Sequence, residues 1–197
     1  MHDVYAVSRF IRAVQAAFES SALVERSAAV VSSVFSDLQS SRIQSSARPE
    51  MLPACVYLSS ALVTASRQLM LWELVESFQA IAGNLEWYRS RMQSNPKTAS
   101  ANFIDGHANA AIFGPGGLVH SDQLRLGVSL LAPHVRHPDH SHSPDEVYLM
   151  ISEGQFRQSG GDWFRPGFGG VLYNESNIVH AMRSGPGPLL AFWALGS

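Results

Sequence analysis

Histidine and carboxylate side chains gather between residues 137 and 148 of this 197-residue chain. His140 and His142 are two residues apart, and Glu146 follows four residues after His142. Residues i and i+2 of a strand point to the same side of a sheet, so both imidazoles are expected to face one enclosed space. Imidazole and carboxylate groups suit divalent transition metals, and His180, on a later apolar segment, supplies a fourth ligand. The spacing therefore predicts a metal site of His140, His142, Glu146 and His180.

The predicted metal is a divalent transition ion, either Zn or one of Fe, Mn, Co and Ni, because nitrogen and oxygen ligands accept all of these. Tyr148 forms a second i,i+2 pair with Glu146 and is expected to face the same space. The other histidines lack such a pattern. We expect them on the surface or in loops: His2, His107, His120 and His134.

The elements that must position these residues are short strands in the second half of the chain. From about residue 102, Gly and Pro separate apolar runs at intervals of roughly ten residues, a pattern typical of an antiparallel sandwich or barrel. The expected strands are Ala110–Phe113, Leu124–Leu131, Glu146–Ile151, Gly170–Tyr173, Ile178–Met182 and Leu189–Leu195.

The first hundred residues have the periodicity of helices instead. Apolar residues recur every three or four positions over 7–18 and over 24–38, and again from Ala54. In the last helical region the apolar side is expected to carry Trp72, Val75, Phe78, Leu85 and Tyr88. Gly83 is a candidate break within this region, and Ser94-Asn95-Pro96 is expected to end it.

The chain is therefore predicted to be α+β, with a helical region over 1–100 and an antiparallel β-barrel over 101–197. The sequence leaves open whether the apolar faces of the helices pack on the barrel or form a dimer interface.

Composition excludes several classes of protein. The 14 Lys and Arg residues do not exceed the 16 Asp and Glu residues, so no basic surface for nucleic acid is expected. No apolar run approaches the roughly 18–20 residues that cross a bilayer, and Arg9 and Arg12 interrupt the first apolar pattern, unlike a signal peptide. The single cysteine, Cys55, fits a reducing compartment. We therefore expect a cytoplasmic protein that binds neither nucleic acid nor membranes.

The histidine pattern resembles the two motifs of the cupin superfamily. His140, His142, Glu146 and Gly154 match the first motif, with one extra residue before the glycine. Gly169 and His180 match the second motif, in which Glu175 and Asn177 stand where the family has Pro and Gly. The resemblance implies a double-stranded β-helix for residues 101–197.

A closer resemblance, to the cupin-type dimethylsulfoniopropionate (DMSP) lyases, covers most of the second half. It rests on Phe113-Gly114-Pro115-x-Gly117, Leu124-Arg125-Leu126-Gly127, Leu131-Ala132-Pro133, the H-x-H-x-x-x-E-x-Y run, His180-Ala181-Met182-Arg183 and Pro188-Leu189-Leu190-Ala191. Those enzymes also have helices before the barrel. They cleave DMSP to dimethyl sulfide and acrylate, so the resemblance implies a metal-dependent carbon–sulfur lyase with a small carboxylate substrate.

The resemblance also implies catalytic roles. Tyr148 becomes the leading candidate for the base, because a nearby cation lowers the pKa of a phenol. His137-Pro138 stands where the family usually has Tyr-Pro, so His137 is a second candidate for the base, or another metal ligand. Leu195 occupies a position at which the family commonly has Trp. An aromatic wall for the sulfonium is expected from Tyr173, Trp163, Trp193 and Phe168.

Two alternatives stay open. The same ligand pattern serves other metal-dependent cupin enzymes, such as dioxygenases and isomerases, acting on a different small carboxylate. A sensor or binding barrel without catalytic activity is the third possibility, although all four candidate ligands are present. A homodimer is the expected oligomer if the helices pair between chains.

Overall fold

The computed structural model describes residues 4–21, 23–43, 47–89, 95–123 and 125–196. Its helices are α1 (Val4–Glu19), α2 (Glu25–Ser40), α3 (Leu58–Ala65), α4 (Trp72–Ala82) and α5 (Phe103–Gly106), with 3-10 turns η1 (Pro53–Tyr57), η2 (Leu69–Leu71) and η3 (Pro96–Thr98). Its strands are β1 (Trp87–Tyr88), β2 (His107–Phe113), β3 (Leu126–Leu131), β4 (Glu146–Met150), β5 (Gln155–Gln158), β6 (Val171–Asn174), β7 (His180–Arg183) and β8 (Leu189–Leu195). No helix among these residues is long and apolar enough to cross a membrane.

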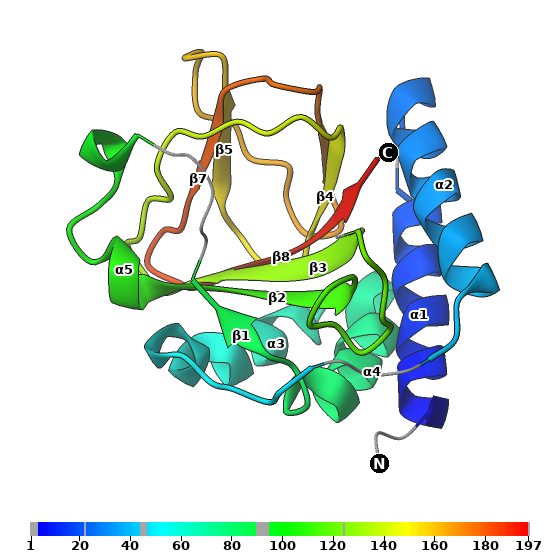
Figure 1. The fold of residues 1–197 in the computed structure, drawn as a ribbon. Helices are drawn as coiled ribbons and strands as arrows, with labels where there is room; N and C mark the ends of the chain where they lie inside the picture. Colours follow the sequence, from blue (N-terminus) through cyan, green and yellow to red (C-terminus); the bar gives the residue numbers. More distant parts are fainter. Residues whose placement is uncertain (1–3, 22, 44–46, 90–94, 124, 197) are drawn as a thin grey trace.

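The strands form two antiparallel sheets that face each other (Figure 1). The larger sheet has the order β1-β2-β3-β8-β4-β6, and the smaller sheet pairs β5 with β7. Single bridges from Arg136 to Arg183 and from His140 to His180 attach the segment 136–140 to β7. The smaller sheet lies over one face of the larger sheet, and α3 and α4 lie below the other face (Figure 1).

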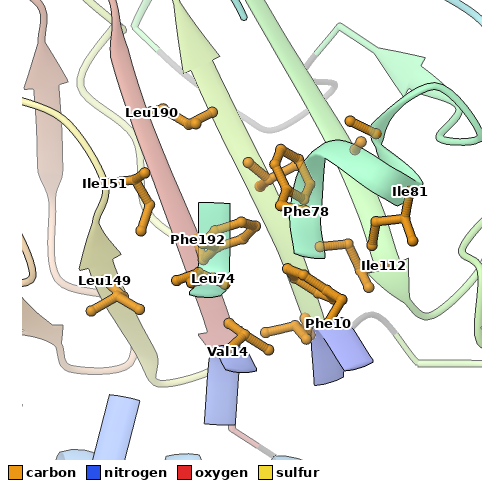
Figure 2. Packing of buried hydrophobic residues seen from close by; sticks show 14 of the residues in the cluster. Phe10, Val14, Leu74, Phe78, Ile81, Ile112, Leu149, Ile151, Leu190 and Phe192 are labelled. Atoms are coloured by element: carbon orange, nitrogen blue, oxygen red, sulfur yellow. The ribbon is translucent and has the colours of Figure 1, made fainter. Parts of the chain in front are cut away.

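Helices α1 and α4 bury their apolar sides against the larger sheet (Figure 2). Phe10 of α1, Phe78 of α4 and Phe192 of β8 form a triangle of rings with centroids 4.9–5.6 Å apart. All three side chains are fully buried. The predicted α+β class is confirmed, and the first-half helices pack on the sheet of their own chain.

Strand β8 belongs to both apolar layers of the protein. Leu190, Phe192 and Ala194 pack in the cluster shared with the helices, whereas Leu189, Ala191 and Trp193 pack in the cluster between the sheets. Period-two alternation thus buries both sides of the strand. This explains why the sequence of β8 reads as a continuous apolar run.

Several element boundaries differ from the sequence prediction. The last long helix ends at Ala82, capped by Gly83, and does not continue to Ser94-Asn95-Pro96, of which Ser94 lies outside the described residues. Tyr88 therefore lies in a strand that the periodicity missed, because β1 pairs with β2 through only two residues. Strand β5 was missed too, since Phe156 is its single buried residue.

One side chain predicted from the helical pattern lies elsewhere than expected, and one residue of a predicted strand is not described. Trp72 was predicted on the apolar side of its helix, but it begins α4 and is 50% exposed, because the buried stripe runs through Leu74, Val75 and Phe78. Leu124, expected to open a strand, lies outside the described residues. Strand β1 lies before residue 100 and pairs with β2, so the larger sheet includes part of the region predicted as helical. The division of the chain at residue 100 stays a prediction.

Candidate metal centre and active site

A cavity of about 610 Å³ opens between the two sheets. The described residues that line it are Glu86, Tyr88, Asn109, Pro115, Gly116, Ser129, His137, His140, His142, Pro144, Glu146, Tyr148, Met182, Trp193 and Leu195. They come from β1, β2, β3, β4, β7 and β8 and from the segments preceding β1, β3 and β4. Both sheets therefore contribute side chains to a single space.

Three of the predicted ligands meet in this part of the fold. The nitrogen atoms that His140, His142 and His180 can offer a metal all lie within 4.8 Å of one another. The His180 ring centroid is 4.1 Å from that of His140 and 5.1 Å from that of His142. The backbone bridge between His140 and His180 brings together residues 40 positions apart in the chain.

Backbone carbonyl groups hold the three imidazoles in place. Nδ1 of His140 is 2.9 Å from the carbonyl oxygen of Pro138, Nδ1 of His142 is 3.0 Å from that of Pro144, and Nδ1 of His180 is 3.0 Å from that of Ile178. A carbonyl oxygen only accepts, so each Nδ1 carries the proton. Each Nε2 then keeps its lone pair for a metal, as outer-shell partners of ligating histidines usually arrange.

Glu146 completes the cluster at the start of β4. Its Oε2 lies 3.2 Å from Nε2 of His142 and 3.3 Å from Nε2 of His180. The same oxygen accepts a 3.0 Å hydrogen bond from Nδ2 of Asn174, whose Oδ1 accepts from Gln158 at 2.8 Å. This chain of amides holds the carboxylate of Glu146 in place.

The electrostatics of the cluster fit a bound cation. Burial, followed by the neighbouring His180, lowers the pKa of His140 to about 4, so this imidazole is neutral near pH 7, as a ligand must be. Burial acts to raise the pKa of Glu146. The imidazoles of His142 and His180 lower it by more, so the pKa of Glu146 lies below its usual value. Burial lowers the pKa of His142, and Glu146 reverses this shift.

His180 gives the sharpest test of fit. Its Nε2 is buried and makes no hydrogen bond of good geometry among the described residues, although Oε2 of Glu146 lies 3.3 Å away. A buried nitrogen without a partner costs free energy, and a metal ion at the convergence of the three imidazoles satisfies it. The donors present therefore fit a divalent transition metal held by three nitrogen atoms and one carboxylate.

Tyr148 lies next to this cluster on β4 and is almost fully buried. Its pKa is raised well above the usual value by burial and then by the carboxylate of Glu146, and the hydroxyl of Ser129 acts in the opposite direction. Glu146, Ser129 and the phenol of Tyr148 all line the same cavity. Trp193 lines the cavity on the adjacent strand and donates from Nε1 to Oγ of Ser129 at 3.1 Å.

His137 also lines the cavity, and the ring centroid of a second histidine, His107, lies 6.0 Å from its own. The ring centroid of His137 is 4.3 Å from that of His140, and burial lowers the pKa of His137 well below the usual value. His107 was expected on the surface, but it opens β2, is buried and stacks on Phe103 at 3.9 Å. Its isolated position in the sequence gave no sign of this contact. His120 and His134 are exposed as expected, and His2 lies outside the described residues.

Three aromatic residues expected at the substrate do not line the cavity. The hydroxyl of Tyr173 donates to Asp145 at 2.7 Å, and Phe168 packs with the helix-side cluster. Trp163 lies beneath the guanidinium of Arg183, whose Cζ is 4.1 Å from the ring centre. Of the four aromatic residues expected at the substrate, all of them described, only Trp193 lines the cavity.

Several lining residues were not predicted at the site. Tyr88 and Glu86 belong to the region read as helix, while Asn109 and Ser129 are single polar residues within apolar strands. A polar residue inside a buried strand is the one signal that marks Asn109 and Ser129. Leu195 does line the cavity at the position where a Trp was expected from the family pattern.

Comparison with known proteins places these features in a family. The family model for dimethylsulfoniopropionate lyase matches residues 26–191. The DMSP lyase DddQ of Ruegeria pomeroyi is 27% identical over 117 residues, which cover 59% of this chain and 57% of that protein. The putative DMSP lyase DddL of Cereibacter sphaeroides is 26% identical over 138 residues, or 70% of this chain and 56% of that protein. The matches thus span somewhat over half the length of these relatives.

The fold is similar as well. The crystal structure of DddQ from Ruegeria pomeroyi superposes with a TM-score of 0.69 at 19% identity, covering 99% of this chain and 93% of that chain. The expected order of helices followed by an antiparallel β-structure is thus shared with that solved structure. Since the family model covers most of the chain, the protein belongs to the dimethylsulfoniopropionate lyase family.

Proposed function

We propose that this protein is a metal-dependent carbon–sulfur lyase that converts DMSP to dimethyl sulfide and acrylate. The observation that carries the proposal is the composition of the cavity, where the cluster of three histidines and Glu146 lies beside a buried Tyr148 and the indole of Trp193. Family membership supports the same reaction.

The charges of the cavity favour a substrate with a cationic end. Its described lining contains the carboxylates of Glu86 and Glu146 and neither Lys nor Arg. A sulfonium group is attracted to the face of an aromatic ring, which contributes about 0.5–2 kcal/mol. Trp193 offers such a face. The negative end of the substrate requires the opposite charge, which the proposed metal supplies.

The reaction is an elimination across two carbon atoms. A metal held by His140, His142, Glu146 and His180 supplies, when bound, stabilisation of the negative charge that develops on the carboxylate side. Burial raises the pKa of the Tyr148 phenol, and a cation bound beside it would lower that pKa and favour the phenolate. As the phenolate, Tyr148 would accept the proton from the carbon next to the carboxylate. The electrons of that C–H bond form the double bond of acrylate, and those of the C–S bond leave on neutral dimethyl sulfide. One proton is released for each DMSP consumed.

His137 is the second candidate for the base. Its Nδ1 lies 3.1 Å from the carbonyl oxygen of Pro138, so its Nε2 is the nitrogen available to the cavity. Substitution of each residue separately distinguishes Tyr148 from His137. Tyr173 and Trp163 have no part in this proposal, because neither reaches the cavity.

Headspace detection of dimethyl sulfide from purified protein and DMSP tests the activity, run beside elemental analysis of the same sample. We expect dimethyl sulfide and acrylate in equal amounts, with no oxygen consumed. Absence of dimethyl sulfide from metal-loaded protein contradicts the proposal. Oxygen consumption with another small carboxylate instead favours a cupin dioxygenase.

The finer features remain predictions from the sequence. Elemental analysis identifies the ion among Zn, Fe, Mn, Co and Ni. Sedimentation of the purified protein tests the expected homodimer, and fractionation of cells tests the cytoplasmic location.

A further inference from the structure

A chain of hydrogen bonds crosses three strands on the wall of the cavity. Asn109 of β2 and Ser129 of β3 are directly paired across the sheet, and Trp193 of β8 reaches Ser129 from the next strand. Nε1 of Trp193 is 3.1 Å from Oγ of Ser129, which is 2.7 Å from Oδ1 of Asn109. None of these contacts is part of the metal cluster.

The chemistry of the donors sets the direction of this chain. An indole N–H only donates, so Oγ of Ser129 accepts from Trp193. The distance of 2.7 Å to Asn109 is typical of O–H···O and shorter than the usual 2.9–3.0 Å of N–H···O. The hydroxyl of Ser129 therefore donates its hydrogen bond to Oδ1 of Asn109.

This arrangement leaves the two N–H groups of Asn109 for the cavity. The side chain lines the cavity and is only partly buried, and no described residue accepts from its Nδ2. Because Oδ1 accepts from Ser129, the amide of Asn109 turns its two N–H groups, and not its oxygen, toward the cavity. Since the described lining holds no Lys or Arg, Asn109 is the side chain there that always presents N–H donors, whatever the pH or the metal content.

We propose that Asn109, oriented by Ser129, donates a hydrogen bond to the substrate carboxylate whose charge the proposed metal offsets, and so contributes to specificity for an anionic end group. The identity of the carboxylate rests on the proposed function. The position is suited to it, because Asn109 and Tyr148 line the same cavity, and Trp193, which bonds Ser129, is the partner of Tyr148 across β8 and β4. A carboxylate held by Asn109 therefore has its neighbouring carbon near the proposed base. Ser129 is a positioning residue in this scheme.

Calorimetric titration of Zn-loaded protein with two probes tests the inference. The first is 3-(methylthio)propionate, which has the carboxylate of the substrate but no sulfonium to expel. The second is its uncharged amide. We expect Asn109→Leu to weaken binding of the carboxylate about 10- to 100-fold, the usual worth of a hydrogen bond to a charged group, while the amide changes little. The near-isosteric Asn109→Asp weakens the carboxylate at least as much, because like charges then meet.

Matched variants separate orientation from damage to the fold. Ser129→Ala should reduce the preference for carboxylate over amide, because the amide of Asn109 is then free to rotate. Ser77→Ala, the same change at a buried serine of α4, should leave the preference unchanged. Unchanged carboxylate affinity in Asn109→Leu, or equal weakening of both probes, overturns the inference.

The same preparations are assayed for dimethyl sulfide release from DMSP. Failure of the wild type to release it contradicts the proposed function, whereas the comparison of the two probes still decides the role of Asn109.

Discussion

The indole of Trp193 lies over the α-carbon of Gly127, its partner across β3 and β8. A Cβ atom at Gly127 would lie 2.1 Å from Cζ2 of Trp193 and 2.5 Å from the backbone oxygen of Ala110. Only glycine leaves room for the ring here. The position of Trp193 in the cavity, and its hydrogen bond to Ser129, therefore depend on the missing side chain of another residue.

Gly127→Ala is expected to displace the indole and to lower the free energy of unfolding by about 1–3 kcal/mol, the usual cost of overpacking. Denaturant unfolding measures the stability, and tryptophan fluorescence reports the displacement. Gly83→Ala is the control, because a Cβ atom there meets nothing within 4 Å and the backbone is helical. That variant should be neutral or more stable by up to about 1 kcal/mol. Equal stability of the two variants would show that the ring is not confined.

His180→Ala should weaken metal binding by more than about tenfold, because it removes one nitrogen of the proposed site. Metal content after dialysis, measured by elemental analysis, checks this. His120→Ala is the matched control, since His120 is exposed and away from the cavity. Retention of wild-type metal content by His180→Ala would place the metal elsewhere.

Tyr148→Phe should lower the turnover of DMSP by about 10²–10⁴-fold, the usual contribution of a general base, and leave metal content unchanged. The ring stays, so packing against Phe156 at 5.4 Å between centroids is kept. Tyr57→Phe, at an exposed tyrosine, serves as the control. Wild-type turnover by Tyr148→Phe assigns the base elsewhere, and His137→Phe is then the variant to measure.

Phe78→Ala should lower the free energy of unfolding by about 3–5 kcal/mol, because it opens a cavity between α4 and the sheet. Denaturant unfolding of the full chain gives the value. The same change at Phe164, which is 40% exposed, should cost much less. Similar losses in both variants would mean that the layer of helices contributes little to stability.

The sequence predicts the parts of the site that follow a local period. His140 and His142 were expected on one side and with His180, and the structure brings all three together with Glu146, although their role as ligands stays a prediction. Strand β8 was predicted with its observed bounds, because a long apolar run between turn residues has few other interpretations.

The rest depends on contacts between residues far apart in the chain. Trp163 and Trp193 are equally aromatic, but one stacks on arginine and the other lines the cavity. Strand β1 consists of two residues and exists only through its pairing with β2, so no period within the sequence reveals it. The burial of His107 likewise arises from stacking on Phe103 after the chain folds.

Successive residues of β8 contact the helix-side core on one face of the sheet and the cavity on the other. Phe192 meets α1 and α4, and the next residue, Trp193, meets the cavity. A change of side-chain volume at the helix interface therefore moves the backbone that carries the indole. Laboratory evolution toward bulkier or smaller substrates can start from Phe10 and Phe78, on the far side of the sheet, without altering any residue that contacts the substrate.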